Sequence, residues 1–309
     1  MLTRRHIRIK VMQSLYSLSN SNDRTLKSHL AFFKNTTRKS FDLYYLLIAT
    51  FKFIFLNAEK KIKSQKKNNI NTIGFLENRI LKNPFFVYVN NNKSIENYLK
   101  KRKINNWKTD YKYIIEIYNS LDNFIDINKN KEMIDFDHNL FCINFYKDFI
   151  ASSNKLYEYI EDSELTWVDD FPVVNTYILK QIKSFYFESY QNLNLPIYNT
   201  KQDEIVFGID LLNYVVSNNE LLNKEIIGRT PNWEFDRIAN LDYILIKMAI
   251  VEFLFFMEIP PKVTINEYLE IAKDYSTPKS NIFINGVLDN ISKDFDSQGK
   301  LNKKGRGLL

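Results

Sequence analysis

Apolar side chains near the start of the chain repeat with the period of an α-helix. Ile7, Val11, Leu15 and Leu18 follow one another at spacings of four, four and three residues, which places them on one helix face. The polar run SNSND begins directly afterwards, at Ser19. The pattern predicts a first helix that packs on a core and ends near residue 20.

The middle of the chain alternates apolar runs with short polar breaks rich in Asn and Lys. Pro84 and Pro172 stand at two of these joints, where a preceding helix cannot continue. We expect helices over 39–65, 72–82, 94–127, 139–162 and 173–192.

The last third of the chain also has helical periodicity. A stripe runs from Ile238 to Phe255, and EIPPK stops it because proline lacks the backbone N–H that a helix needs. Thr264 and Glu267, in TINE, have the spacing of a capping box, which predicts that the next helix starts there. Gly286 lies in the middle of the last helix, so we expect another helix to approach it closely.

Composition favours an all-α fold. The chain has 309 residues with only seven glycines and seven prolines, and 45% of its residues are hydrophobic. No glycine stands between Gly74 and Gly208, which argues against β-hairpins that need positive φ. The single cysteine, Cys142, cannot form an internal disulfide, and we expect a reducing, cytoplasmic location. No membrane span is expected, because the apolar runs 43–56 and 243–256 are short and interrupted by charges.

Charge is distributed unevenly along the chain. The net charge is +7, but the first 22 residues carry +4, residues 203–296 carry −8, and the last 13 carry +4. Such blocks favour an anionic polymer at one surface and a cationic partner at another. In the middle region, KKRK at 100–103 with Trp107 is compatible with RNA binding, and a solvated helix face has the same composition.

Catalytic and metal-binding patterns are missing from the sequence. The three histidines, His6, His29 and His138, are far apart, and no Gly-rich phosphate loop occurs. Asp169 and Asp170 are paired carboxylates, and a polar cap before a proline-led helix explains them better than acid/base chemistry. We therefore expect no catalytic residue, metal or cofactor.

Two separated parts of the chain resemble the NusB family of bacterial transcription antitermination factors. The first is RRHIRIKVMQSLY, from Arg4 to Tyr16. The second holds NLDYILIKMAIVEFLF, IPPKVTINEYLEIAKDYS and NIFINGVLDNIS, in that order, between Phe207 and Ile291. The sequence differs from the family pattern at several positions; for example, Lys279 stands where an acidic residue is common.

The resemblance implies an all-α pair of helical bundles with a large inserted helical region. The implied divisions are an N-terminal RNA-binding helix at 1–20, an inserted region of unknown role at 21–199, a helical core at 200–296 and a basic flexible tail at 297–309. It implies a regulator and not an enzyme. The implied partners are single-stranded boxA-like RNA of ribosomal RNA operons, the ribosomal small-subunit protein NusE, and the RNA polymerase antitermination complex, which reads through terminators.

By position within the matched motifs, the resemblance assigns RNA contact to Arg4, Arg5, His6, Arg8, Gln13, Tyr16 and Lys279. It assigns contact with the protein partner to three acidic residues: Glu234, Asp236 and Asp242. Cations at a helix N-terminus oppose the helix dipole at a cost of about 0.3–1 kcal/mol each. Phosphate binding and base stacking would explain why they are there.

Two other functions stay open at this stage. An RNA-modifying enzyme is conceivable because NusB-like domains also precede ribosomal RNA methyltransferase domains, but no glycine loop for a methyl donor follows in this sequence. A helical scaffold is the other alternative, in which the inserted region binds a protein and the NusB-like part no longer binds boxA RNA. Tyr16 is equally open, as a stacking platform for a base or as a half-buried core aromatic.

Overall fold

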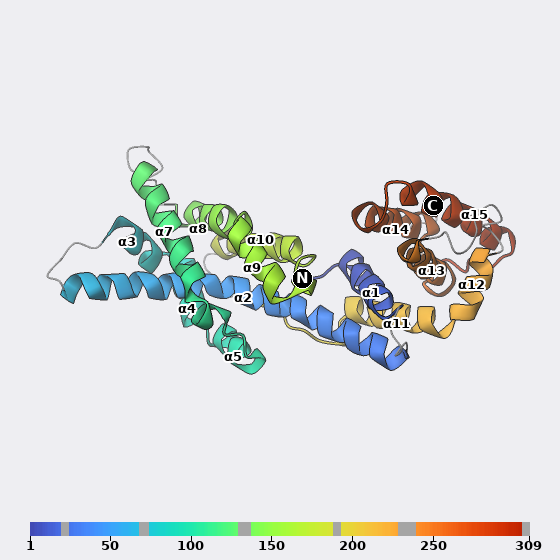
Figure 1. Cartoon of the computed structure of the whole chain (residues 1–309), viewed down its shortest axis with the longest axis horizontal. Coiled ribbons are helices and arrows are strands. Elements are labelled where there is room, and N and C mark those ends of the chain that lie inside the picture. Colours follow the sequence, from blue (N-terminus) through green and yellow to red (C-terminus); the bar gives the residue numbers. More distant parts are fainter. Residues whose placement is uncertain (20–24, 68–73, 129–136, 188–192, 228–238, 305–309) are drawn as a thin grey trace. The chain divides into compact units, whose positions relative to one another are not determined.

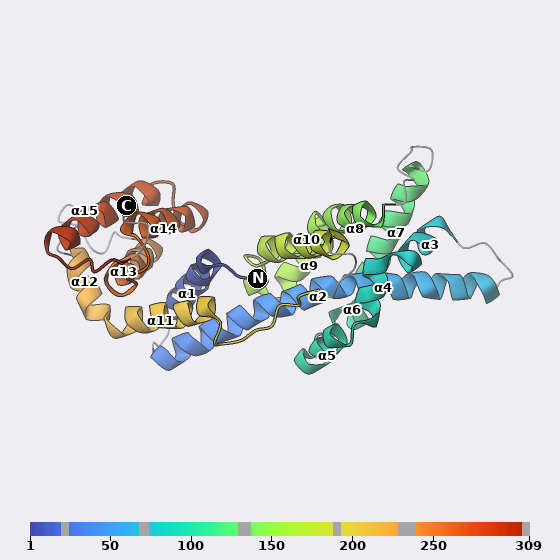
Figure 2. The same ribbon diagram turned by 180° about the vertical axis from the view of Figure 1, so that it is seen from behind.

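A computed structural model describes residues 1–19, 25–67, 74–128, 137–187, 193–227 and 239–304 (Figure 1). Within these ranges every regular element is a helix, and Figure 2 shows the same helices from behind. The all-α prediction is therefore confirmed.

The chain consists of two compact units. We call residues 2–37 with 199–309 the terminal unit, because both chain ends supply it, and residue 1 with 38–198 the middle unit. Helix α2 (Leu26–Lys67) gives its first turns to the terminal unit and the remainder to the middle unit. This division differs from the predicted boundary at residue 20, because the start of α2 belongs with the first helix.

The middle unit is a helical body with its own core. After α2 it contains α3 (Phe75–Lys82), α4 (Pro84–Asn91), α5 (Lys93–Arg102), α6 (Asn106–Thr109), α7 (Tyr111–Asn128), α8 (His138–Phe145), the π-helix η1 (Tyr146–Ala151), α9 (Asn154–Ser163), the 3-10 turn η2 (Leu165–Trp167) and α10 (Phe171–Phe187). Along α2, Leu43, Leu47, Phe51 and Ile54 are fully buried, at the spacings that put them on one face. This stripe forms the centre of the middle unit's core.

Helix α2 is, among the described residues, the one helix long and apolar enough to cross a membrane. Of its most apolar 18-residue window, 78% is buried inside the protein. Burial in a protein core accounts for this composition, as the sequence predicts for the run 43–56.

The predicted run 94–127 is divided into α5, α6 and α7. The N-cap residue of helix α5 is Asn92, whose side chain accepts hydrogen bonds from the backbone N–H groups of Ser94 and Ile95 at 2.9 and 3.1 Å. The C-cap residue is Lys103, which has a left-handed backbone with φ 58°. Local capping by single residues therefore breaks a run that hydrophobic periodicity alone leaves continuous.

A buried asparagine joins three helices of the middle unit. The Asn83 Oδ1 atom accepts hydrogen bonds from the Phe85 backbone N–H at 3.0 Å, the Tyr186 hydroxyl at 2.7 Å and the Cys142 thiol at 3.2 Å. Burial raises the pKa of Cys142 to about 12. The thiol is consequently a packing group that stays protonated and unreactive at neutral pH.

The terminal unit contains α1 (Arg4–Ser19), the start of α2, α11 (Asp203–Ser217), α12 (Asn219–Ile227), α13 (Asn240–Phe255), α14 (Pro261–Tyr275) and α15 (Ser280–Ser297). Helix α1 packs against α11 and α13, and α13, α14 and α15 pack on one another (Figure 1). The start of α2 is tied to α1, because the Ser14 hydroxyl donates to the His29 carbonyl at 2.9 Å.

Gly208 is the glycine on which close packing of the terminal unit depends. A Cβ atom there would lie 2.4 Å from Phe33 Cζ and 2.5 Å from Ile7 Cγ2, so α11 can approach α1 and α2 only because this side chain is missing. The prediction that another helix closely approaches Gly286 is wrong. A Cβ atom at Gly286 would meet nothing within 4 Å, because that side of α15 is open.

The described part of the basic tail is attached to the terminal unit. The Lys303 ammonium donates to the backbone carbonyls of Glu252 and Phe256, at 2.8 and 2.9 Å. These carbonyls belong to the last turn of α13 and the residue after it, where a cation complements the helix dipole. Residues 297–304 therefore do not form a free tail, and residues 305–309 lie outside the described residues.

Candidate functional site

Helix α1 carries most of the residues predicted to contact RNA, and the structure divides them into buried and exposed residues. Ile7 and Val11 are fully buried, as the apolar stripe predicts, and so is the cation Lys10, with 1% of its surface exposed. Tyr16 is 52% exposed, so about half of its side-chain surface is available to a ligand. The helix therefore has one face in the core and one in solvent.

Arg8 lies on the buried face of α1. Its Nε and Nη2 atoms donate to the two carboxylate oxygens of Glu252, on α13, at 2.7 and 2.9 Å, and the two side chains are 4% and 0% exposed. Two hydroxyl groups complete the site, because Tyr268 and Thr264 donate to Glu252 at 2.7 and 3.2 Å. The carboxylate of Glu252 therefore accepts four hydrogen bonds, and such complete pairing offsets the cost of removing both charges from water.

The charged state of this pair follows from its partners. Burial disfavours the Arg8 charge, but the hydrogen bonds and the negative charge of Glu252 outweigh it, so the pKa of Arg8 is raised above its ordinary value. Burial, together with the Glu252 charge, also raises the pKa of Tyr268. Arg8 is thus a buried structural cation that joins α1 to α13, a placement that does not favour the predicted contact with RNA.

Arg5 lies at the border between the two faces. Its Nε and Nη2 atoms donate to the carboxylate oxygens of Glu267, on α14, at 2.9 and 2.8 Å. The Arg5 side chain is 45% exposed and that of Glu267 22%. The hydrogen bonds from Arg5 outweigh the effect of burial and lower the pKa of Glu267, so this carboxylate is ionised at neutral pH. Arg8 adds a longer contact to Glu267 at 3.4 Å.

The role of Glu267 differs from the predicted capping box. Helix α14 starts at Pro261, which is well suited to a first helical position. Thr264 and Glu267 therefore lie inside the helix, where their side chains turn toward Glu252 and the arginines of α1. Thr264 and Glu267 of the TINE pattern therefore belong to the ion-pair network and do not cap the helix.

Arg4 is, like Arg5, an exposed cation of α1. Its guanidinium group lies 5.3 Å from the ring centre of Phe207, on α11, and Arg8 lies 5.2 Å from the same ring. Arg4 has no ion pair among the residues that the structure describes. It is therefore held in place by an aromatic face while its charge is uncompensated locally.

The other predicted RNA contacts have varied surroundings. Lys279 is exposed and occupies the N-cap position of α15, where its charge adds to the positive end of the helix dipole. His6 is half-buried, and its Nδ1 atom lies 2.9 Å from the Thr3 hydroxyl. Burial first, and then the charges of Arg5 and Lys10, lower the pKa of His6, so it carries no charge at neutral pH. Gln13 is half-buried.

Of the three residues predicted to contact a protein partner, only Asp242 lies in the described part of the chain. Asp242, in the first turn of α13, is 4% exposed and accepts a hydrogen bond from the Ser276 hydroxyl at 2.5 Å. Its carboxylate ties α13 to the residue that follows α14, and this burial does not favour the predicted contact of Asp242 with a protein partner. Glu234 and Asp236 lie outside the described residues.

One residue of the basic cluster KKRK has a structural role in the middle unit, whereas Lys100, Lys101 and Lys103 are exposed. Arg102 donates to both carboxylate oxygens of Asp42, at 2.8 and 2.7 Å. Trp107 is buried and donates to the Leu46 carbonyl at 2.8 Å, so its ring is not available to a nucleic-acid base. Asp170 is also buried and accepts from the Ser40 hydroxyl at 2.8 Å, which supports its non-catalytic reading.

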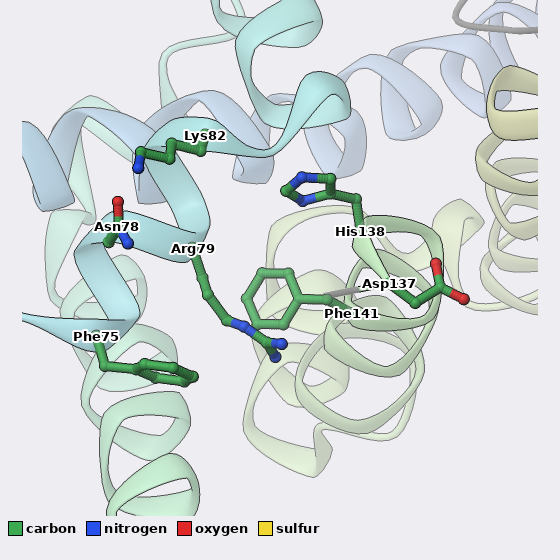
Figure 3. Close-up of a pocket in the computed structure, with 7 residues that line it drawn as sticks. All are labelled: Phe75, Asn78, Arg79, Lys82, Asp137, His138 and Phe141. Atoms are coloured by element: carbon green, nitrogen blue, oxygen red, sulfur yellow. The ribbon is translucent and has the colours of Figure 1, made fainter. Parts of the chain in front are cut away.

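A small pocket lies between α3 and the start of α8 (Figure 3). The Arg79 guanidinium group sits between two rings, 5.1 Å from the centre of Phe75 and 5.5 Å from that of Phe141. Asp137 points away from it in Figure 3, because its carboxylate caps α8 through the Asn139 backbone N–H at 2.8 Å. No group of three potential metal ligands occurs anywhere in the described part of the chain.

Comparison with known proteins gives a consistent family for the C-terminal part. The model of the NusB family matches residues 173–293, from α10 to α15. The transcription antitermination protein NusB of Salinibacter ruber is 47% identical over 103 residues, which are 33% of this chain and 64% of that protein. The NusB protein of Geobacter sulfurreducens is 39% identical over 93 residues, which are 30% of this chain and 67% of the relative.

The chain belongs to the NusB family. A third relative, the NusB protein of Chloroherpeton thalassium, is 43% identical over 109 residues, 35% of this chain and 51% of its own length. The chain thus spans about half to two thirds of the length of these relatives. No solved structure matches it. The resemblance of α1 to the start of NusB proteins rests on its own residues, since the family match begins at residue 173.

The sequence reading missed the residues that organise this site: Phe207, Glu252, Glu267 and Tyr268. One signal was present, because Glu252 stands inside the apolar run 243–256. A carboxylate on an otherwise buried helix needs a cationic partner, and the arginines of the first helix were the available candidates.

Proposed function

We propose that this protein is a NusB-type antitermination factor that binds single-stranded boxA-like RNA of ribosomal RNA operons together with NusE. It acts in the cytoplasm, within the RNA polymerase antitermination complex, and promotes read-through of terminators. Binding requires no catalysis and no cofactor. The family membership of residues 173–293 and the names of the curated relatives support this function.

The single observation that carries the proposal is the exposed edge of α1. Arg4 lies on the face of Phe207 with its charge uncompensated, Arg5 is half-exposed, and Tyr16 presents a free aromatic surface. Guanidinium groups bind phosphates with paired hydrogen bonds, and an aromatic ring stacked on an unpaired base contributes about 1–3 kcal/mol. With Lys279 at the positive end of α15, this set suits a single strand.

The partner surface is proposed from charge alone. Residues 203–296 carry a net charge of −8, which suits a basic ribosomal protein such as NusE. Of the predicted contacts, Glu234 and Asp236 remain proposals. In domain terms, residues 1–20 and 200–296 would provide the NusB-like functions, and 21–199 would be an insertion with a separate role.

The test is fluorescence anisotropy of a labelled boxA RNA and a scrambled RNA, with and without NusE, over a salt series. Three phosphate contacts, from Arg4, Arg5 and Lys279, predict a log-log salt slope of about −2, at about −0.7 per contact on a single strand. Reversing the charge in Arg4→Glu with Lys279→Glu should weaken binding at least about tenfold, since charged hydrogen bonds contribute about 1.5–3 kcal/mol each.

Lys293→Glu is a matched control, because Lys293 is an exposed lysine of the terminal unit that is paired with Asp289. Binding of boxA and scrambled RNA with equal affinity, unchanged in the Arg4→Glu/Lys279→Glu variant, would contradict the proposal. That result would favour the scaffold function, in which the middle unit carries the interaction.

A further inference from the structure

The structure assigns a phosphate subsite to the guanidinium group of Arg5. In the RNA-free protein the carboxylate of Glu267 occupies this subsite, and it must leave before a phosphate of the RNA can bind there. This inference rests on the proposed RNA-binding function and adds to it the residue that sets RNA affinity.

The geometry of the Arg5–Glu267 pair is the first support. Both carboxylate oxygens accept from Arg5, at 2.9 and 2.8 Å, which is the paired arrangement that a guanidinium group offers equally to carboxylates and phosphates. As long as Glu267 occupies these donors, Arg5 cannot offer them to RNA. The internal carboxylate therefore marks where an anion sits on α1.

Exposure makes the exchange feasible. The side chains of Arg5 and Glu267 are 45% and 22% exposed, and ion pairs at such sites are typically worth only about 0–1 kcal/mol. The Arg8–Glu252 pair, by contrast, is 4% and 0% exposed and cannot open without breaking the core. Of the two arginines of α1 that are tied to acids, only Arg5 can change partners.

A second contact provides for the displaced carboxylate. One Glu267 oxygen already lies 3.4 Å from Arg8 Nη1. When a phosphate takes Arg5, Glu267 can stay beside Arg8 and is not left unpaired. The groups that face Glu267 are Arg5, Arg8 and His6 from α1, with Glu270 on its own helix. The exchange therefore costs one half-exposed ion pair and leaves the buried network intact.

Neutralising Glu267 tests the exchange. In Glu267→Gln, the RNA no longer competes with an internal anion, so we expect about two- to fivefold tighter boxA binding, the factor that corresponds to an ion pair of up to about 1 kcal/mol. Glu270→Gln is the matched control: it removes the same charge one turn away, from a carboxylate paired with Lys273 and not with Arg5.

The outcomes separate this inference from the proposed function. Tighter binding in Glu267→Gln but not in Glu270→Gln supports the subsite. Equal effects of both variants, or no effect of either, overturn it and leave the proposed function standing. Failure of the unaltered protein to bind RNA overturns the proposed function itself.

A second measurement covers the case in which Glu267→Gln fails to fold. In the unaltered protein labelled with carboxyl-¹³C glutamate, titration by NMR follows Glu267 with and without RNA. Loss of Arg5 as a partner predicts that RNA moves the pKa of Glu267 upward, toward its ordinary value. An unchanged or lower pKa in the complex overturns the inference.

Discussion

Arg8 and Glu252 are separated by 244 positions in the chain, yet they form a paired, almost fully buried ion pair at 2.7 and 2.9 Å. The pair joins the first helix to α13, the most deeply buried helix of the NusB-like core. A sequence motif that resembles an RNA-binding start therefore also holds the unit together. Within this motif Arg8 is buried, whereas Arg5 and Tyr16 are exposed.

Breaking this pair should strongly destabilise the terminal unit. We expect Arg8→Met to lower the free energy of unfolding by about 3–5 kcal/mol, because it leaves the Glu252 carboxylate buried without its cation. Arg5→Met should cost about 1 kcal/mol or less, as for other half-exposed pairs. Urea denaturation followed by circular dichroism measures both. Equal costs for the two variants would show that Arg8 is not the buried structural cation described above.

Two glycines offer a matched pair of alanine substitutions. Gly208→Ala should destabilise the protein by about 1–3 kcal/mol, because its Cβ would overlap Phe33 and Ile7 in a packed core. Gly286→Ala should instead be neutral or stabilising by up to about 1 kcal/mol, since it has open space and alanine favours a helix. Thermal melts of both variants decide the point, and a destabilised Gly286→Ala would indicate an unrecognised contact on α15.

Lys247 should titrate near pH 8. Burial lowers the pKa of Lys247 to about 8, and its ammonium donates to Asn219 Oδ1 at 2.6 Å. Because the unfolded chain holds this proton up to about pH 10.5, Lys247 makes the protein more stable as the pH rises from about 8 toward 10.5. Pulsed acetylation with peptide mapping measures the midpoint. An acetylation midpoint above pH 10 would contradict the lowered pKa of Lys247. A Lys247→Met variant whose stability changes with pH as that of the unaltered protein does would also contradict it.

Cys142 should report on the packing of the middle unit. With its pKa raised to about 12 and its side chain buried, the thiol should react with iodoacetamide at pH 8 only when the structure opens. Asn83→Leu removes the acceptor shared by Cys142 and Tyr186 and should cost about 2 kcal/mol or more. Labelling should then accelerate at least about tenfold, whereas Asn91→Ala, an exposed asparagine of α4, should leave the rate unchanged.

Sequence periodicity was sufficient for the fold class and for much of the core. The spacing of Ile7 and Val11 correctly places them in the interior, and the family resemblance of the C-terminal part is confirmed by the comparisons. These features depend on local order along one helix. Helix ends were predicted less well, because single capping residues such as Asn92 and Lys103 decide them.

The charged residues were harder to interpret, since their surroundings come from distant segments. Arg4, Arg5 and Arg8 are equivalent in the sequence, but their partners differ. Arg4 lies on the ring of Phe207, Arg5 pairs with the partly exposed Glu267, and Arg8 pairs with the buried Glu252. Asp242 is acidic and lies in the first turn of a helix, yet it is buried and accepts a hydrogen bond from Ser276, which lies beyond the next helix. A single sequence contains no direct record of these contacts.

Photo-crosslinking tests the central claim most directly, because it locates bound RNA on the protein. A boxA RNA with 4-thiouridine is bound to the full chain with NusE, irradiated and digested, and the crosslinked peptides are identified by mass spectrometry. We expect crosslinks in the peptides that contain Arg4 to Tyr16 and Lys279, and loss of the crosslinks to the Arg4–Tyr16 peptide in Tyr16→Ala. Crosslinks confined to residues 38–198 would contradict it and would place RNA binding in the middle unit.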